Sequence, residues 1–133
     1  MSIVDFFSHT AEGLFFECNS RRSWRFEHFG LKGEEGLIEM PEGSLSTSPI
    51  SYWFLPADPN DNAPVHGTVL FCNAGTHNMG FHLPQVSWLV PASYNVVMFD
   101  YHGAGLSEGR TSLSGILEAV SYTHLRAHET KAN

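Results

Sequence analysis

One pentapeptide of the sequence has the form G-x-S-x-G: residues 105–109, GLSEG. This form is typical of a serine held on a tight turn between a strand and a helix, where a general base can activate the hydroxyl as a nucleophile. On such a turn the acid and then the histidine of the triad follow the serine in chain order. The candidates that follow Ser107 are Glu108, Glu118, His124, His128 and Glu129. A nucleophilic role for Ser107 therefore depends on two histidines close to the C-terminus.

Those two histidines lie in a segment of unusual sequence, residues 120–133. Its first eleven residues, VSYTHLRAHET, resemble a transposase-based DNA-sequencing adapter translated in one reading frame. We interpret residues 120–133 as a non-native tail, which carries no information about the fold. The alternative is a native polar helix, in which His124 and His128 have a spacing that can hold a metal ion. With the tail set aside no histidine follows Ser107, so we expect Ser107 not to be a nucleophile.

Four further residues, Cys72, His77, His82 and His102, are of types that bind zinc. They follow apolar segments, and ligands of open α/β sheets bind at the carboxyl ends of the strands. His77 and His82 are five residues apart, which does not match the i, i+4 spacing of helical ligands, so we expect no metal site. Cys72 is expected to be a small buried hydrophobic residue. Asp100 is expected to order the loop after it as a hydrogen-bond acceptor.

The elements that would position these residues are two short apolar segments and a helix between them. Residues 67–72 (GTVLFC) and 94–100 (YNVVMFD) predict buried parallel strands. The helix between them is predicted to start near Pro84, in a first-turn position where no N–H is needed. One face of this helix is apolar and carries Leu83, Val86, Leu89 and Val90. A strand, helix and strand of this length predict a right-handed parallel crossover.

The remaining segments complete an α/β layer fold. Residues 37–40 and 50–56 predict the two strands of an antiparallel hairpin, and residues 57–64 are rich in turn formers and predict an exposed loop. A last helix is predicted from about Leu113. We expect three parts: an aromatic-rich, partly helical segment (residues 1–30), one α/β domain (residues 31–119), and the non-native tail (residues 120–133).

Residues 67–115 resemble the α/β-hydrolase superfamily, in particular its branch of esterases, lipases and serine aminopeptidases. The motif that carries the resemblance is VMFDYHGAGLSEG at residues 97–109, which is similar to the family's D-x-R-G-x-G-x-S-x-G after its fourth strand. His102 stands where the family usually has arginine. The same motif accounts for Ser107 without a nucleophilic role. The resemblance implies a partial α/β-hydrolase fold that ends before the nucleophile elbow.

The resemblance also implies an oxyanion hole. The family's turn after its third strand often reads His-Gly-x, and the backbone N–H of the last of these residues binds the substrate oxyanion. An ungapped alignment puts Asn73 at the histidine and Gly75 at the donor, whereas the alternative alignment gives the donor role to Asn73. Such a donor typically lowers the reaction barrier by about 3 to 4 kcal/mol. The residues implied at the mouth of the active site are Tyr101, His102, Gly103 and Gly105.

The expected function follows from this resemblance. The complete protein would hydrolyse an ester, thioester or amide of a small molecule or lipid through a Ser-His-Asp/Glu triad, without a cofactor. This chain would lack the triad and be inactive. The alternative is a small non-catalytic α/β module that binds a ligand or a protein. In either case an uncovered sheet edge would favour aggregation.

Composition excludes several other classes of protein. The formal net charge is −7 and the seven Lys and Arg residues form no cluster, so we expect no nucleic-acid partner. No apolar segment approaches the roughly 20 residues needed to span a bilayer, and the first residues lack the features of a secretory signal. Two cysteines without paired-ligand spacing fit a reducing compartment. We expect a soluble cytoplasmic protein, unless an anchor precedes Met1.

Overall fold

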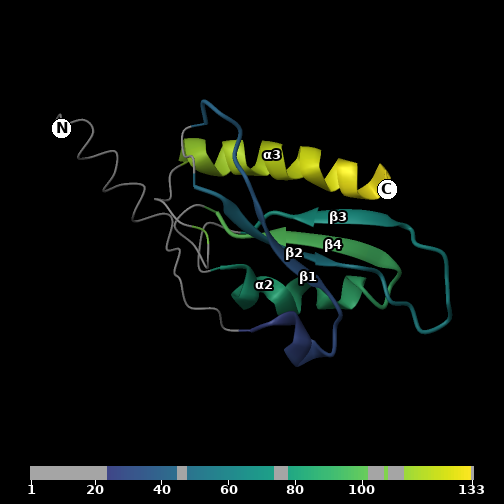
Figure 1. Cartoon of the computed structure of the whole chain (residues 1–133). Coiled ribbons are helices and arrows are strands. Elements are labelled where there is room, and N and C mark those ends of the chain that lie inside the picture. The colour runs from purple at the N-terminus through teal and green to yellow at the C-terminus, as the bar shows by residue number, and fades with distance from the viewer. Residues whose placement is uncertain (1–23, 45–47, 74–77, 102–106, 108–112, 133) are drawn as a thin grey trace.

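The computed structural model describes residues 24–44, 48–73, 78–101, 107 and 113–132. Helices and strands alternate along this part of the chain (Figure 1). The elements are η1 (Phe26–Phe29), β1 (Glu34–Ile38), β2 (Ile50–Leu55), β3 (Gly67–Phe71), α2 (Met79–Val86), η2 (Ser87–Leu89), β4 (Tyr94–Phe99) and α3 (Leu113–Ala132), where η denotes a 3-10 helix. The α/β class predicted from the sequence is confirmed.

The four strands form one mixed sheet in the order β1-β2-β4-β3. The pairs β1-β2 and β2-β4 are antiparallel, and β3-β4 is parallel. This arrangement confirms the predicted hairpin and the predicted parallel pair joined through a helix. The first strand lies earlier than predicted, at Glu34–Ile38 instead of residues 37–40. Its position is fixed by pairing with β2, because Ile38 is opposite Ile50, the first residue of that strand.

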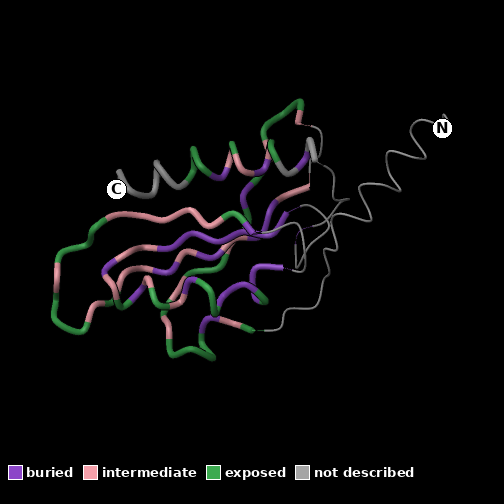
Figure 2. The backbone as a smooth tube through the Cα atoms, turned by 180° about the vertical axis from the view of Figure 1, so that it is seen from behind, coloured by how far each residue is buried: buried purple, intermediate pink, exposed green. Residues whose placement is uncertain are grey.

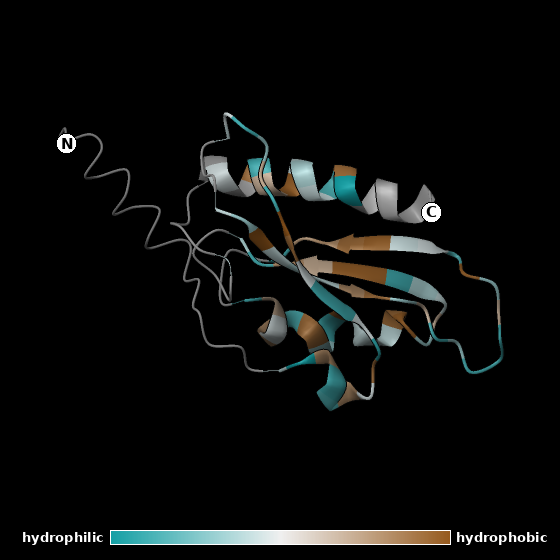
Figure 3. Cartoon of the chain, in the orientation of Figure 1, coloured by the Kyte–Doolittle hydropathy of each residue, from teal (hydrophilic) through white to brown (hydrophobic). Residues whose placement is uncertain are grey.

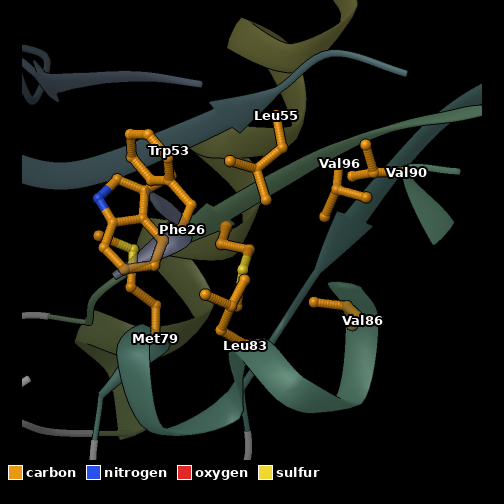
Figure 4. Packing of buried hydrophobic residues seen from close by; sticks show 9 residues of the cluster. Phe26, Trp53, Leu55, Met79, Leu83, Val86, Val90 and Val96 are labelled. Carbon is orange, nitrogen blue, oxygen red and sulfur yellow. The ribbon is translucent and has the colours of Figure 1, made fainter. Parts of the chain in front are cut away.

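The sheet lies between two helical layers, with α3 over one face and α2 with η2 over the other (Figure 1). Each face has its own hydrophobic cluster. Figure 4 shows the cluster on the α2 face, which consists of Phe26, Trp53, Leu55, Met79, Leu83, Val86, Val90, Val96 and Met98. The cluster on the α3 face consists of Ile38, Ile50, Phe99, Tyr101 and Ala119. Neighbouring residues Met98 and Phe99 of β4 point to opposite clusters, as the alternation of a strand requires.

Helix α2 starts earlier than predicted, so the prediction that Pro84 occupies its first turn was wrong. The helix begins at Met79, after the N-cap residue Asn78, whose side chain accepts a hydrogen bond from the Phe81 N–H. Pro84 lies inside the helix and cannot donate to the carbonyl one turn earlier. The α-helix ends soon after it, at Val86, and continues as η2. The predicted apolar face is confirmed, since Leu83, Val86 and Val90 are buried and Leu89 packs against them.

Helix α3 begins at Leu113, as predicted, and continues through the segment that resembles an adapter. Ala119 is fully buried against the sheet. Further along, Thr123 is buried too, and its Oγ1 has no hydrogen-bond partner within the described residues. Leu117 and Leu125 instead are exposed to solvent. No helix in the described ranges is both long and apolar enough to cross a bilayer.

The connection between β2 and β3 confirms the predicted exposed loop over residues 57–64. Most of its residues are exposed (Figure 2). The Asp61 carboxylate accepts a hydrogen bond from the Ala63 N–H at 3.1 Å, and Asn62 adopts a left-handed conformation with φ of 55°. Asn and Asp are the residues that tolerate or cap such turns. Of the predicted N-terminal segment, residues 1–30, only the part from Trp24 onward is described, and it contains η1.

Candidate functional site

The candidate site lies at the edge of the sheet where the parallel strands β3 and β4 end and α2 begins (Figure 1). In the register of these strands Phe71 is opposite Met98. Two residues further along each strand direction lie Asn73 and Asp100. Ligands of open α/β sheets bind at this edge because the carboxyl ends of the strands and the N-terminus of the connecting helix meet there. The edge therefore collects the polar residues that the sequence singled out.

Asn73 connects the ends of the two parallel strands. It is 8% exposed, and its side-chain Nδ2 donates a hydrogen bond to the Phe99 carbonyl oxygen at 3.2 Å. Its own carbonyl oxygen accepts a hydrogen bond from the Tyr101 hydroxyl at 2.6 Å. The remaining polar atom of the side chain, Oδ1, has no hydrogen-bond partner in the described part of the chain. An unpaired buried acceptor is costly, so this atom is an exception to the usual pairing of buried polar groups.

Asp100 holds the start of helix α2. The residue is fully buried, and its Oδ1 accepts a hydrogen bond of 2.7 Å from the Met79 backbone N–H. A second first-turn donor, the Phe81 N–H, is bonded to the Asn78 side chain. A carboxylate at this place also interacts favourably with the positive end of the helix dipole. The prediction that Asp100 acts as a structural acceptor is confirmed, although the group that it orders is the helix start and not the loop after β4.

Ser107 is buried and fully engaged. Its Oγ accepts a hydrogen bond of 2.8 Å from the Ser51 backbone N–H of β2. The same oxygen donates to the Asp100 carbonyl oxygen, also at 2.8 Å. A nucleophilic serine needs an exposed hydroxyl next to a general base, whereas this proton is directed at a backbone carbonyl. The geometry supports the prediction that Ser107 is not a nucleophile. Sequence analysis did not predict the contact with Ser51, for which the sequence contains no local signal.

Tyr101 is the one residue of the predicted active-site loop that the structure describes, apart from Ser107. Its ring packs against Phe99 with a centroid distance of 5.3 Å and an interplanar angle of 83°, and 3% of the residue is exposed. Together with the hydrogen bond to Asn73, this packing fixes the first residue after β4. The predicted oxyanion donor Gly75 and the predicted loop residues His102, Gly103 and Gly105 lie outside the described residues. Their roles remain predictions.

The candidate zinc residues are described only in part. Cys72 is exposed, so the prediction that it is buried was wrong. It directly follows β3, which is an outer strand of the sheet, and partial burial still raises the pKa of its thiol. His82 is buried in α2 between the rings of Phe71 and Phe81. Within the described ranges no three His, Cys, Asp or Glu residues gather as metal ligands, and His77 and His102 lie outside them.

Sequence comparison finds relatives for part of the chain. No protein-family profile matches it. An uncharacterized protein of Escherichia coli strain K12, YfhR, is 43% identical over 68 residues, which are 50% of this chain and 23% of that protein. YfhR of Salmonella typhimurium is 38% identical over 79 residues, 56% of this chain and 27% of that protein. The aligned part thus spans about a quarter of the length of these relatives.

Structure comparison finds similar folds. The esterase Pf2001 of Pyrococcus furiosus superposes with a TM-score of 0.55 at 19% identity, covering 87% of this chain and 42% of the esterase. A second crystal form of the same esterase gives a TM-score of 0.54 at 20% identity, covering 84% of this chain and 41% of the esterase. At such low identity the likeness concerns the fold alone. The chain therefore has an α/β-hydrolase-like fold that corresponds to less than half of this esterase.

Proposed function

We propose that this chain is the N-terminal part of a serine hydrolase that cleaves an ester, thioester or amide of a small-molecule or lipid-like substrate. The triad of Ser, His and Asp or Glu belongs to the rest of the protein, so the chain alone is inactive. The observation that carries the proposal is the fold shared with an esterase, together with a polar edge at which two parallel strands end. No cofactor takes part in triad chemistry.

In this proposal the edge supplies one half of an oxyanion hole. The turn between β3 and α2 is anchored at both ends, by the hydrogen bonds of Asn73 on one side and by the Asp100 and Asn78 contacts to the first turn of α2 on the other. Anchored ends favour a preorganised backbone, which is what makes an oxyanion donor effective. The donor is the N–H of Gly75, with Asn73 as the alternative. The loop from Tyr101 to Gly109 forms one wall of the site.

The absence of a triad in this chain rests on two arguments. The hydroxyl of Ser107 is bound between two backbone groups and is buried. The histidines that follow it lie in residues 120–133, which we propose to be a non-native tail. The packing of α3 supports this interpretation, because a threonine without a partner faces the sheet while Leu125 faces solvent. A helix selected to cover a sheet presents its apolar face to it.

A fluorophosphonate probe, which labels activated serines, tests the inactivity of the chain. The 133-residue protein is expected to remain unlabelled and to hydrolyse p-nitrophenyl acetate no faster than its Ser107→Ala variant. The variant is the matched control because it removes only the hydroxyl of the G-x-S-x-G pentapeptide. Labelling that the variant abolishes would contradict the proposal and identify Ser107 as a nucleophile.

A further inference from the structure

The two outer strands of the sheet differ in charge. The outer strand β1 (sequence EEGLI) carries Glu34 and Glu35, and both residues are exposed. The outer strand β3 (sequence GTVLF) carries no charged residue and is apolar over most of its length (Figure 3). Natural sheets protect an edge with charges, prolines or bulges, because an unprotected edge pairs with other chains. By this criterion β1 is a protected edge and β3 is not.

The exposure of β3 shows that its outer side is open. Every residue of the strand is half-buried, whereas Val96–Phe99 of the inner strand β4 are all buried. Within the described residues β4 is the one strand that pairs with β3. The outward N–H and C=O groups of β3 can therefore accept another strand through main-chain hydrogen bonds. The side chains on this strand add apolar contacts on both faces of the sheet, since Leu70 packs towards α3 and Phe71 towards α2.

The net charge of the chain decides which edges of two copies can meet. Each copy carries a formal net charge of −7, so two copies repel one another at a distance. Pairing of two β1 edges would place Glu34 and Glu35 of both copies beside each other, and like charges on neighbouring strands are destabilising. Pairing of two β3 edges brings no charged strand residues together. The outer edge of β3 is thus the favoured place for contact between copies.

We infer that β3 of one copy pairs with β3 of a second copy of this chain. Dimers that use the same surface on both copies have twofold symmetry, and a twofold axis perpendicular to the sheet makes the two β3 strands antiparallel. The pairing joins the two four-stranded sheets into one continuous sheet. Val69, the middle residue of β3, lies nearest the axis when the two strands overlap completely. This inference is independent of the proposed hydrolase function, because it uses only the edges of the sheet.

Sedimentation equilibrium over a wide range of protein concentrations tests the inference. The 133-residue chain is expected to shift from monomer to dimer as its concentration rises. Val69→Lys places two ammonium groups near the axis and is expected to raise the dimer dissociation constant about tenfold or more, as edge lysines do. Leu37→Lys is the matched control, because it puts the same charge on the opposite edge at a residue that is already 57% exposed; it should dimerise like the wild type.

Three results would overturn the inference: a monomer at all concentrations, equal effects of both lysine variants, or growth beyond the dimer, which a closed twofold contact does not allow. Amide hydrogen exchange of the unmodified chain provides a test that does not depend on the folding of a variant. Protection of Gly67–Phe71 is expected to rise with concentration while that of Glu34–Ile38 stays constant. Protection of β3 that is independent of concentration would show that the chain covers its own edge, and would contradict pairing between copies.

Discussion

The Ser107 hydroxyl accepts a hydrogen bond of 2.8 Å from the backbone N–H of Ser51, a residue 56 positions earlier in the chain. By also donating to the Asp100 carbonyl oxygen, it ties the segment after β4 to the strand β2. A pentapeptide that matches a nucleophile motif is thus used as a structural link. This explains why a motif alone does not identify a catalytic serine without its structural context.

Ser107→Ala is expected to lower the free energy of unfolding by about 1–3 kcal/mol, because the variant removes the acceptor of a buried N–H and the donor to a buried carbonyl. Urea denaturation followed by circular dichroism measures the change. Ser121→Ala is the matched control, since the Ser121 hydroxyl is exposed and donates only to the Leu117 carbonyl of its own helix. The control should leave stability nearly unchanged. Equal stability of both variants would argue against the structural role of Ser107.

Asp100→Ala is expected to destabilise the chain by about 1.5–3 kcal/mol, because the carboxylate accepts a buried hydrogen bond from the first turn of α2. Asp61→Ala removes a similar acceptor of a backbone N–H, from Ala63, but at an exposed loop. We expect this control to change the unfolding free energy by less than about 0.5 kcal/mol. A comparison of thermal and urea unfolding of the two variants checks the difference. A larger effect of the Asp61 variant would contradict the assignment of Asp100 as the helix anchor.

Glu35 connects the hairpin to the N-terminal η1 region. Its carboxylate accepts hydrogen bonds from Trp53 Nε1 at 3.2 Å and from the Arg25 guanidinium at 3.1 Å. The Trp53 side chain is fully buried, so Glu35→Ala removes the acceptor of a buried N–H and should cost about 1–3 kcal/mol of stability. Glu27→Ala removes the other carboxylate bound to Arg25, which is exposed, and should have little effect. Similar urea midpoints for both variants would contradict this account.

The reactivity of Cys72 should be lower than its exposure suggests. Partial burial raises the pKa of its thiol above the ordinary value, so at a given pH near that value a smaller fraction is thiolate. In a Cys18→Ser variant, which leaves Cys72 as the one thiol, alkylation by iodoacetamide should show its half-maximal rate at a higher pH for the folded than for the urea-unfolded chain. An unfolded chain with the higher midpoint would contradict the effect of burial.

The oxyanion assignment can be tested in the complete protein recovered from the source DNA. Gly75→Pro removes one backbone N–H and is expected to lower kcat about 10²- to 10³-fold, as the loss of one oxyanion donor does. Asn73→Pro is the comparison variant, with folding of both checked by circular dichroism. A decrease in kcat confined to the Asn73 variant would assign the donor to Asn73 and contradict the preferred alignment.

The sequence was most informative where one local rule decided the structure. Continuous apolar segments predicted β3 and β4 because strands of a parallel pair are covered on both faces. The start of α2 was missed because Pro84 was given more weight than the spacing of Met79, Leu83 and Val86, which repeats at i, i+4 and i+7 and begins directly after Asn78. An N-cap followed by this spacing was the signal that could have placed the helix.

The candidate site was predicted only as far as topology reaches. Asn73 and Asp100 could be placed at one edge because each follows a strand of a parallel pair. The bond from Tyr101 to the Asn73 carbonyl and the bond from Ser51 to Ser107 depend on side-chain packing between distant segments, which no local pattern encodes. The exposure of Cys72 likewise follows from the position of β3 at the edge of the sheet, and strand order could not be derived from an apolar segment alone.

The central claim is that a serine hydrolase was interrupted after Ala119, and resequencing of the source DNA across this codon, from a library prepared without transposase, tests it most directly. We predict that the reading frame continues past Ala119 into a short apolar strand followed by a second Gly-x-Ser-x-Gly, with an acid and a histidine further on. A frame that instead reads residues 120–133 and then stops would contradict the claim and favour a small non-catalytic α/β binding module.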